Sequence, residues 1–270
     1  MTLSQQVALE EQGPAGIRAR IRTGEWSGPT GGLAEGYVQA NMVILPKEQA
    51  FDFLVFCQRN PKPCPLLEVT DPGDPEPKMM APGADLRTDV PRYRVWRNGD
   101  LADEVTDITD LWRDDLVAFL LGCSFTFDTA LVNAGIDVPH MRKGSGQNVP
   151  MFVTNVQTRP AGQFHGPLVV SMRAVPAEKV VKAVQVTSRF PTMHGSPVHI
   201  GPGEQIGIKN PRKPDYGTPV EIGEGDVTMF WACGVTPQEV CLASKPPFMI
   251  SHAPGHMFIT DVRDEDMAVL

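Results

Sequence analysis

Six side chains suited to proton transfer or covalent catalysis lie in segments expected to be turns, within two residues of a glycine or proline. They are His194, His199, His252, His256, Cys123 and Cys233. An imidazole can donate or accept a proton near neutral pH, and a thiol at the start of a helix can ionise and act as a nucleophile. These residues are therefore the catalytic candidates. The structural alternatives are hydrogen-bonded loop histidines and inert buried cysteines.

A second set of residues is suited to hold an anion. Residues 142–150 combine two cations, two glycines and three neutral hydrogen-bonding side chains. Glycine lets backbone N–H groups approach an anion, and arginine can bind a carboxylate with two hydrogen bonds. The segment has neither the spacing of a Walker loop nor that of a dinucleotide-binding loop, and its alternative is a polar surface loop. The candidates for substrate binding are Arg142, Lys143, Ser145, Asn148, His165, Arg173 and Arg189.

The net charge of -8 is unevenly distributed along the chain. Residues 100–115 hold seven acids and one base, whereas residues 142–215 hold ten bases and three acids. Local positive potential concentrates small anions, while an acidic remainder repels nucleic acid. The pattern predicts a small-molecule carboxylate as the partner and no nucleic acid, although single bases can equally be solvated surface.

The sequence lacks the patterns of metal sites, disulfide frameworks and membrane segments. Its five cysteines are odd in number, widely spread and without a zinc-type CxxC pair, so we expect no metal, no other cofactor and no disulfide framework. No apolar run approaches the roughly eighteen residues of a membrane span, and residues 1–12 do not have the pattern of a signal or transit peptide. These absences predict a cytoplasmic protein that does not associate with membranes, and they leave a homodimer open.

Hydrophobic periodicity predicts alternating strands and helices. Strands are expected at 42–45, 66–70, 92–97, 101–106, 151–157, 168–173, 226–232, 248–251 and 257–261. Helices are expected at 16–22, 46–60, 109–122, 125–134 and 176–186, with another opened by a capping box at Thr236–Glu239. Asn98-Gly99, between two of the strands, is a strong hairpin signal.

This alternation at both ends of the chain favours an α/β fold, more finely a three-layer αβα sandwich with a smaller inserted α+β lobe. Residues 1–124 and 226–270 would form the sandwich. The basic residues 125–225 would form the inserted lobe.

Several motifs, taken in order, resemble those of the D-glutamate cyclase family, whose members are also labelled hydro-lyases. They include GYVQAN (36–41), GCSF (122–125), NVPM (148–151), FHGP (164–167), VSMR (170–173), PTMHGSPVH (191–199), WACGVTPQ (231–238) and SHAPGHM (251–257). The resemblance runs from about residue 14 to residue 262. Its strength lies in the order and density of the motifs, since no single one is specific.

The resemblance implies an α/β enzyme of two parts that converts D-glutamate into 5-oxo-D-proline and water. Lactam formation requires a base for the amine, an acid for the departing oxygen and donors for the oxyanion. We expect arginines to hold the α-carboxylate and the four histidine candidates to transfer protons, with an acyl-enzyme at Cys123 or Cys233 as the rival route. Two other functions stay open: a hydro-lyase acting on another small carboxylate, and a protein that only binds an acidic metabolite.

Overall fold

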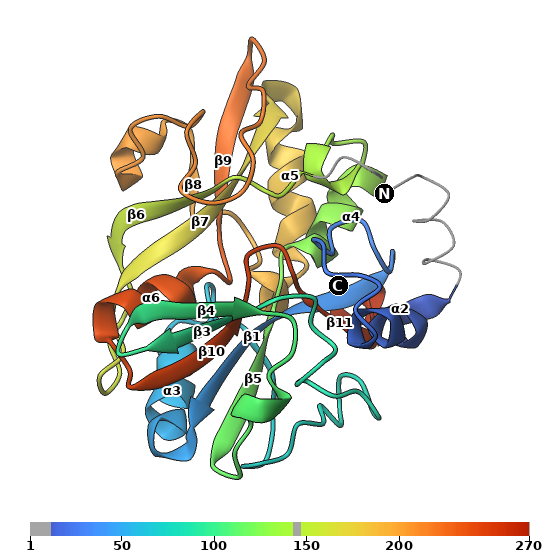
Figure 1. Cartoon of the computed structure of the whole chain (residues 1–270). Coiled ribbons are helices and arrows are strands. Elements are labelled where there is room, and N and C mark those ends of the chain that lie inside the picture. Colours follow the sequence, from blue (N-terminus) through green and yellow to red (C-terminus); the bar gives the residue numbers. More distant parts are fainter. Residues whose placement is uncertain (1–11, 143–146, 270) are drawn as a thin grey trace.

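Two β-sheets hold most of the regular structure in the computed structural model, which describes residues 12–142 and 147–269 (Figure 1). The larger sheet contains β1 (Tyr37–Pro46), β2 (Leu66–Val69), β3 (Tyr93–Arg97), β4 (Asp100–Val105), β5 (Leu116–Gly122), β10 (Phe248–His252) and β11 (Phe258–Arg263). The smaller sheet contains β6 (Met151–Gln157), β7 (Pro167–Pro176), β8 (His199–Ile200) and β9 (Asp226–Ala232). The helices are α2 (Gly13–Arg22), α3 (Lys47–Arg59), α4 (Phe125–Asn133), α5 (Val180–Ser188) and α6 (Thr236–Ser244).

The strands within both sheets pair in antiparallel fashion. The larger sheet has the order β2-β5-β1-β10-β3-β4, with β11 also paired to β1, and the smaller has the order β6-β7-β9-β8. The α/β class predicted from the sequence is confirmed. The finer prediction of a three-layer αβα sandwich is not confirmed, because the strands are divided between two sheets.

β1 and β5 lie inside the larger sheet because both are apolar over most of their length. β5 reads LVAFLLG and all of its residues are buried, and residues 38–45 of β1 are buried without interruption. The helix predicted over 109–122 is wrong: Thr109–Leu111 forms only a short 3-10 turn before β5. A strand that is buried on both faces has apolar side chains at every position, so its pattern also fits a helix. Pairing with β1 and β2 decides the conformation.

The Asn98-Gly99 turn joins β3 to β4 as predicted. Asn98 and Gly99 have φ angles of 52° and 84°, which are the left-handed values that a tight two-residue hairpin requires. Arg97 and Asp100 face each other across the turn. This prediction succeeded because the residues of the turn alone determine its geometry.

The predicted helices at 16–22, 46–60, 125–134 and 176–186 are confirmed as α2, α3, α4 and α5, the last preceded by a 3-10 turn. The capping box is wrong. The Thr236 hydroxyl donates to the carbonyl of Cys233 (2.7 Å) and accepts the N–H of Val169, and the Glu239 carboxylate accepts the Tyr216 hydroxyl. Neither side chain caps α6. Among the described helices, none combines the length and apolar character needed to cross a membrane.

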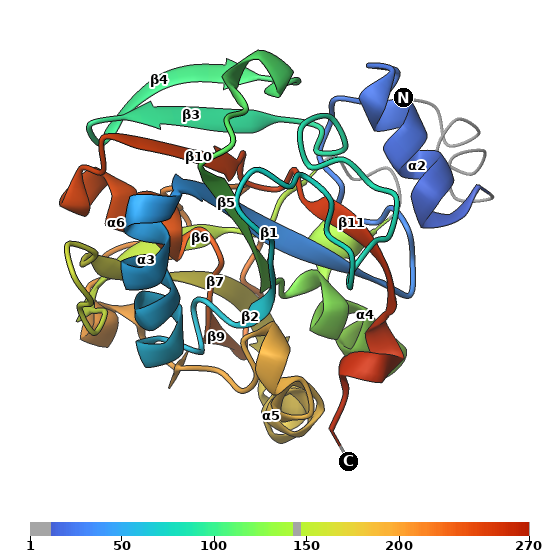
Figure 2. The same ribbon diagram turned by 90° about the horizontal axis from the view of Figure 1, so that it is seen from below.

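The two sheets share a buried apolar core. Its largest cluster joins Met42 and Ile44 of β1 to Trp231 of β9 and Val175 of β7, together with Phe127 of α4. In Figure 1 the larger sheet occupies the lower part of the molecule and the smaller sheet the upper part. Seen from below, α3 and α4 lie near opposite ends of β1, and both contact it (Figure 2).

Strand pairing bears on the predicted division into a sandwich and an inserted lobe. β9, assigned to the sandwich, pairs with β7 and β8 in the smaller sheet. Helix α4, assigned to the inserted lobe, contacts β1 of the larger sheet. The chain therefore returns to the larger sheet only after β9, and the domain boundaries stay a prediction.

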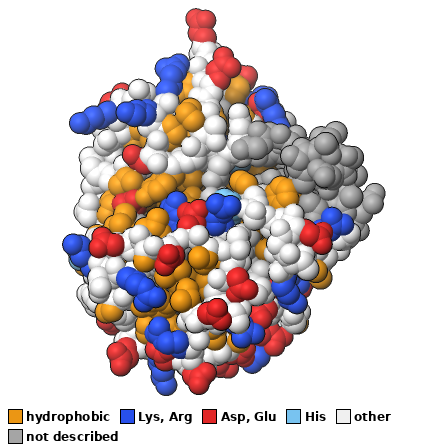
Figure 3. Space-filling model, viewed as in Figure 1, with side chains coloured by type: hydrophobic (Ala, Val, Ile, Leu, Met, Phe, Trp, Pro, Cys, Tyr) orange, Lys and Arg blue, Asp and Glu red, His pale blue; other side chains and the backbone are white. Residues whose placement is uncertain are grey.

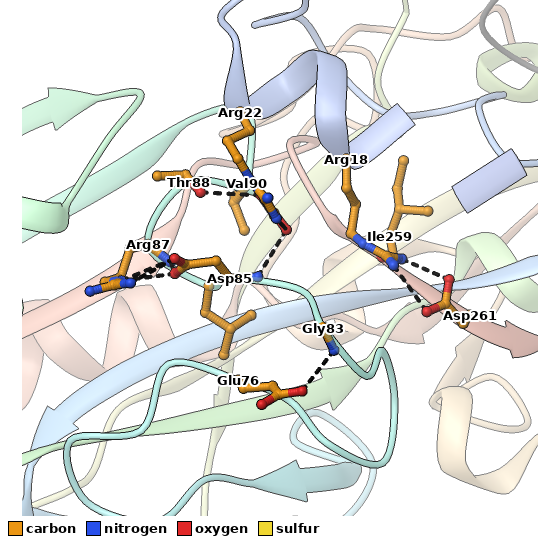
Figure 4. A network of polar contacts seen from close by, with 12 residues as sticks. Arg18, Arg22, Glu76, Gly83, Asp85, Arg87, Thr88, Val90, Ile259 and Asp261 are labelled. Carbon is orange, nitrogen blue, oxygen red and sulfur yellow. Dashed lines mark hydrogen bonds and ion pairs between the residues drawn. The ribbon is translucent and has the colours of Figure 1, made fainter. Parts of the chain in front are cut away.

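A network of ion pairs anchors α2 and the long connection between β2 and β3 (Figure 4). Arg18 donates to both carboxylate oxygens of Asp261 in β11, at 2.9 Å each. Arg22, one turn further along α2, donates to both oxygens of the fully buried Asp89 at 2.8 and 2.7 Å. A buried carboxylate needs such a partner to offset its desolvation. The network thus fixes a connection that has little regular structure of its own.

Candidate active site

One small cavity gathers thiol, imidazole and carboxamide groups from widely separated parts of the chain. It has a volume of about 20 Å³, and it lies where the carboxyl-terminal ends of β5 and β9 approach each other, one from each sheet (Figure 1). The polar groups of its lining include Asn41, Cys123, Asn148, His194, Cys233 and His252. The cavity therefore brings together both cysteine candidates, two histidine candidates and one substrate-binding candidate.

Cys123 and Cys233 occupy matching positions in the two sheets. Each is the first residue after a strand, β5 or β9, and a helix, α4 or α6, begins shortly afterwards. Each sulfur accepts a hydrogen bond from the backbone N–H two residues later, that of Phe125 or Val235. Burial raises the pKa of Cys123 to about 12 and that of Cys233 to about 11. Both thiols are therefore protonated at neutral pH.

His194 presents a neutral imidazole to the cavity. The residue has a φ angle of 72° in the turn after Pro191–Met193, and its Nδ1 lies 2.6 Å from the carbonyl oxygen of Lys62. Such a contact requires a hydrogen on Nδ1, so we assign Nε2 as the acceptor. Burial lowers the pKa of His194 to about 4, and the positive charge of Arg173 acts in the same direction.

His252, on β10, presents a second neutral imidazole. Its Nδ1 lies 3.1 Å from the backbone nitrogen of Met42 and 3.3 Å from the carbonyl oxygen of the same residue. The shorter contact makes Nδ1 an acceptor and places the hydrogen on Nε2. That Nε2 atom is buried and has no hydrogen-bond partner among the described residues. Burial lowers the pKa of His252 to about 4, so the two histidines offer one acceptor and one donor.

The Asn148 carboxamide packs against Gly255, which lies in the connection between β10 and β11. Gly255 has a φ angle of +80°, and a Cβ at this position would lie 2.4 Å from Asn148 Nδ2. Only glycine therefore fits against the carboxamide. The Oδ1 atom of Asn148 accepts the N–H of Val149 at 2.9 Å, which fixes the orientation of the amide at the cavity wall.

A buried ion-pair network supports the start of α4. Arg173 of β7 donates to both oxygens of Asp128 (2.9 and 2.5 Å) and to the hydroxyl of Ser124 (2.9 Å), the residue after Cys123. His140 Nε2 lies 2.8 Å from Asp128. Burial opposes ionisation of Asp128, but the charges of Arg173 and His140 outweigh it and lower the pKa of this carboxyl. Arg173 is thus engaged by protein groups, and its positive charge favours ionisation of both cavity thiols.

Three histidine candidates do not line the cavity. His199, on the two-residue strand β8, has its Nε2 2.8 Å from the carbonyl of Pro202 and packs against Phe230. His165 is exposed on the connection between β6 and β7. His256 is half-buried, and burial lowers its pKa. Their catalytic or binding roles stay predictions.

The arginine candidates at 142 and 189 lie at the surface. Arg142 is 64% exposed and pairs with Asp137, and Arg189 is exposed at the end of α5. Lys143 and Ser145 lie outside the described residues. On the face shown in Figure 3, basic and acidic side chains are interspersed and form no continuous basic surface. The basic middle of the sequence is therefore not seen to converge on the cavity in the described structure.

The cavity and its support also contain residues that the sequence analysis did not select. Asn41 donates from Nδ2 to the carbonyl of Gly122 at 2.6 Å, and Asp128 and His140 belong to the ion-pair network. Asp128 had a visible signal, because it is an acid within the otherwise apolar stretch FTFDTALV. Asn41 ends the motif GYVQAN, whereas His140 had no signal outside the tertiary structure.

In the described parts of the chain, no group of three or more His, Cys, Asp or Glu side chains converges as metal ligands would. Metal-independent catalysis stays a prediction.

The chain matches the family model described as D-glutamate cyclase over residues 117–261, which include every polar cavity residue named above except Asn41. It is 60% identical over 263 residues to a protein of Stutzerimonas stutzeri, covering 97% of this chain and 98% of the relative. It is 62% identical over 253 residues to a protein of Geobacillus kaustophilus, covering 94% and 95%. It is 57% identical over 257 residues to a protein of Bacillus subtilis, covering 95% and 99%.

Each of these three relatives bears the name "Putative hydro-lyase". The matches extend over nearly the whole length of both partners, so the similarity is not confined to one motif. The resemblance first seen in the motifs is confirmed, and the chain belongs to the D-glutamate cyclase family of enzymes.

Proposed function

We propose that this enzyme is a hydro-lyase that closes D-glutamate into 5-oxo-D-proline and releases water, and that the cavity between β5 and β9 is its active site. The observation that carries the proposal is the convergence of two neutral imidazoles, those of His194 and His252, on one cavity. Lactam formation needs one group to accept a proton and another to donate one. The assigned tautomers supply that pair.

In the proposed reaction the two histidines act on opposite ends of the forming bond. His194 Nε2 takes a proton from the substrate ammonium, and the resulting amine attacks the side-chain carboxyl carbon. In the tetrahedral centre the attacking nitrogen passes one of its two remaining protons to a carboxyl oxygen, which becomes a hydroxyl. The C–O bond to this hydroxyl breaks as His252 Nε2–H protonates it, so that it leaves as water and the other oxygen forms the lactam carbonyl. The proton on His194 then restores His252 through solvent, so the cycle balances.

The low pKa of His194 fits a substrate with two carboxylates. An imidazole with a pKa of about 4 is a weak base. A carboxylate that binds beside it stabilises the imidazolium and raises that pKa. The substrate therefore contributes to the activation of its own base, and a neutral analogue without carboxylates should not.

The first turn of α4 is suited to hold the oxyanion. This helix begins beside the cavity, two residues after Cys123, whereas the first N–H groups of α6 are already bonded to Cys233 and Val235. The unpaired N–H groups and the positive end of the dipole at a helix N-terminus stabilise negative charge. In this role they would act on the tetrahedral centre more than on the substrate, which is what lowers a barrier.

The cavity must enlarge to hold the substrate. A volume of about 20 Å³ accommodates little more than one water molecule. Phe125 lines both this cavity and a neighbouring pocket of about 80 Å³. We therefore expect the Phe125 ring to shift on binding, so that the two spaces join.

A covalent route through Cys123 or Cys233 is the mechanistic rival. Its first step would be attack by a thiolate on the side-chain carboxyl carbon. Burial raises the pKa of both thiols, and a protonated thiol is a poor nucleophile. This favours the imidazole route.

The test is to incubate EDTA-treated protein separately with D-glutamate and L-glutamate and to follow 5-oxoproline by chiral chromatography. We expect an initial rate of 5-oxo-D-proline formation with the D-isomer alone, unchanged by EDTA. Folded protein that forms no product from D-glutamate would overturn the proposal. A screen of other small carboxylates would then separate a different hydro-lyase from a protein that binds an acidic metabolite without turnover.

Cytoplasmic location and a homodimer also stay proposals. Light scattering on the purified protein would determine the assembly.

A further inference from the structure

The proposed cyclisation leaves two reactive groups of the cavity unused. Lactam formation changes bonds at the amine nitrogen and the side-chain carboxyl carbon, and the two imidazoles supply its acid and base. Cys123 and Cys233 nevertheless both line the cavity, at 6% and 8% exposure. Their thiols are close enough that charge on Cys233 raises the pKa of Cys123. The two thiols are therefore placed to act together.

The two thiols have the same local backbone setting but come from different sheets. Each follows the last residue of a strand, accepts the N–H two residues later and precedes a helix. One strand, β5, belongs to the larger sheet, and the other, β9, to the smaller. Figure 1 shows β5 rising and β9 descending toward the level at which the sheets meet. A substrate between these strand ends would have one sulfur contributed from each sheet.

We propose that Cys123 and Cys233 form a two-base pair that exchanges the α-proton of an amino dicarboxylate, so that the enzyme also interconverts D- and L-glutamate. The choice of glutamate rests on the proposed function, whereas the assignment of the thiols rests on their geometry.

The exchange is balanced without an oxidant or cofactor. The thiolate of one cysteine removes the α-proton: the C–H bond breaks, an S–H bond forms, and the electron pair stays on the substrate as the enolate of its α-carboxyl group. The thiol of the other cysteine then protonates the opposite face: its S–H bond breaks and a new C–H bond forms. The configuration is inverted, and the negative charge has moved from one sulfur to the other.

The surroundings suit a pair that carries a single negative charge. Both thiols are protonated at rest, so the exchange begins when one of them gives its proton to the neutral imidazole of His194, which lines the same cavity. Low local dielectric and mutual repulsion then disfavour loss of the second thiol proton, which leaves one thiolate and one thiol. Burial strengthens the thiolate as a base, which helps with a weakly acidic C–H bond. The charge of Arg173, the two backbone N–H donors and the two helix N-termini stabilise the single charge.

The first experiment uses the wild-type protein in D₂O. D-Glutamate and L-glutamate are supplied separately, and ¹H NMR and chiral chromatography follow the α-hydrogen, the enantiomer composition and any 5-oxoproline. We expect deuterium at Cα and appearance of the opposite enantiomer from either starting isomer. L-glutamate should then give 5-oxo-D-proline only after a lag.

The outcomes separate this proposal from the proposed function. Cyclisation of D-glutamate with full retention of the α-hydrogen would overturn the two-thiol exchange and leave the cyclase intact. Exchange without lactam would support the thiol pair and overturn the cyclase. Absence of both reactions with either isomer would overturn both.

Single variants test whether each thiol acts on one face of the substrate α-carbon. In Cys123→Ser and Cys233→Ser a hydroxyl, a far weaker base, replaces one thiol, and we expect racemisation to fall by about 100-fold or more. Loss of the α-hydrogen should persist mainly from one enantiomer in Cys123→Ser and mainly from the other in Cys233→Ser. Cys241→Ser, which removes a buried thiol of α6 outside the cavity lining, should leave both rates within about two-fold.

A purely structural role for the thiols would not produce this crossed pattern. Equal loss of exchange from both enantiomers in each folded variant would contradict the assignment of one thiol to each face. Circular dichroism of each variant establishes that it is folded, and the wild-type experiment decides the proposal even where a variant is unstable.

Discussion

Gly234 lies directly against the carboxamide of Asn41: a Cβ at residue 234 would come 2.0 Å from Asn41 Nδ2. That same nitrogen donates to the carbonyl of Gly122, immediately before Cys123. Gly234 itself immediately follows Cys233. One carboxamide on β1 therefore spans the two strand ends that carry the thiols, and the absence of a side chain at 234 makes the contact fit.

Substitution of this glycine should disturb the cavity. In Gly234→Ala the methyl group displaces Asn41, and we expect unfolding to become easier by about 1–3 kcal/mol and the cyclisation rate to fall by about ten-fold or more. Gly31→Ala is the matched control, because its new Cβ would meet its nearest neighbour at 3.6 Å. Urea unfolding and initial rates compare the two. A Gly234→Ala protein with wild-type rate and stability would mean that Asn41 is not held as described.

Histidines inside and outside the cavity should differ sharply in function. In His194→Gln the proposed base is lost while the side chain can still donate to Lys62, so we expect kcat to fall by about 100-fold or more. His199→Gln, at the edge of the smaller sheet, should keep kcat within about two-fold. Steady-state kinetics with D-glutamate provides the comparison. Equal loss of kcat at both positions would show that this cavity is not the active site.

Stability should decline in mild acid because of the buried imidazoles. His194 and His252 have a pKa of about 4 in the folded protein, against 6.5 as the ordinary value. Between these values the unfolded chain binds more protons, so the contribution of each histidine to stability is complete above 6.5 and is lost as the pH falls toward 4. We expect a loss on the order of 2 kcal/mol per histidine.

Urea unfolding across this pH range measures the effect, and His252→Gln should flatten the curve. Asp264 acts in the opposite direction, since burial raises its pKa to about 6 and its neutral form is favoured on acidification. If the free energy of unfolding increased as the pH was lowered from 6.5 to 4, the histidines would not dominate the pH dependence of stability.

Loss of the buried Arg173–Asp128 pair should reduce the free energy of unfolding far more than loss of the exposed Arg142–Asp137 pair. In Arg173→Met the fully buried Asp128 loses its main partner, and we expect the free energy of unfolding to fall by about 3–5 kcal/mol. Arg142→Met breaks an exposed pair with Asp137, and its effect should stay within about 1 kcal/mol. Chemical denaturation measures both. A small loss in Arg173→Met would mean that His140 suffices to hold the carboxylate.

Much of the local structure was readable from neighbouring residues. The hairpin at Asn98-Gly99 and the start of α3 after Pro46 depend on backbone preferences of a few residues, and both predictions were correct. The segment 116–122 was misread because an uninterrupted apolar run fits either a buried strand or a helix, and the choice depends on β1 and β2. The capping box failed because Thr236 and Glu239 found partners distant in the sequence.

For the site, residue types and turn context selected six catalytic candidates, and four of them, Cys123, Cys233, His194 and His252, line one cavity. They could not separate these from His199, which has the same chemistry and similar neighbours. They also attributed anion binding to arginines by charge alone, although Arg142 and Arg173 are engaged with carboxylates. Ion pairing across 45 residues, as between Arg173 and Asp128, leaves no local trace.

The sequence by itself determined the family, the α/β class, the hairpin and the chemical inventory of the site, because each of these depends on residue identity and short-range order. The tertiary structure alone decided that β5 and β9 end at the same place and that their two cysteines and two neutral histidines share one cavity. It also decided which cations are engaged by carboxylates. The physical reason is that burial and long-range pairing set the pKa and the partners of a side chain, and both arise only when distant segments pack together.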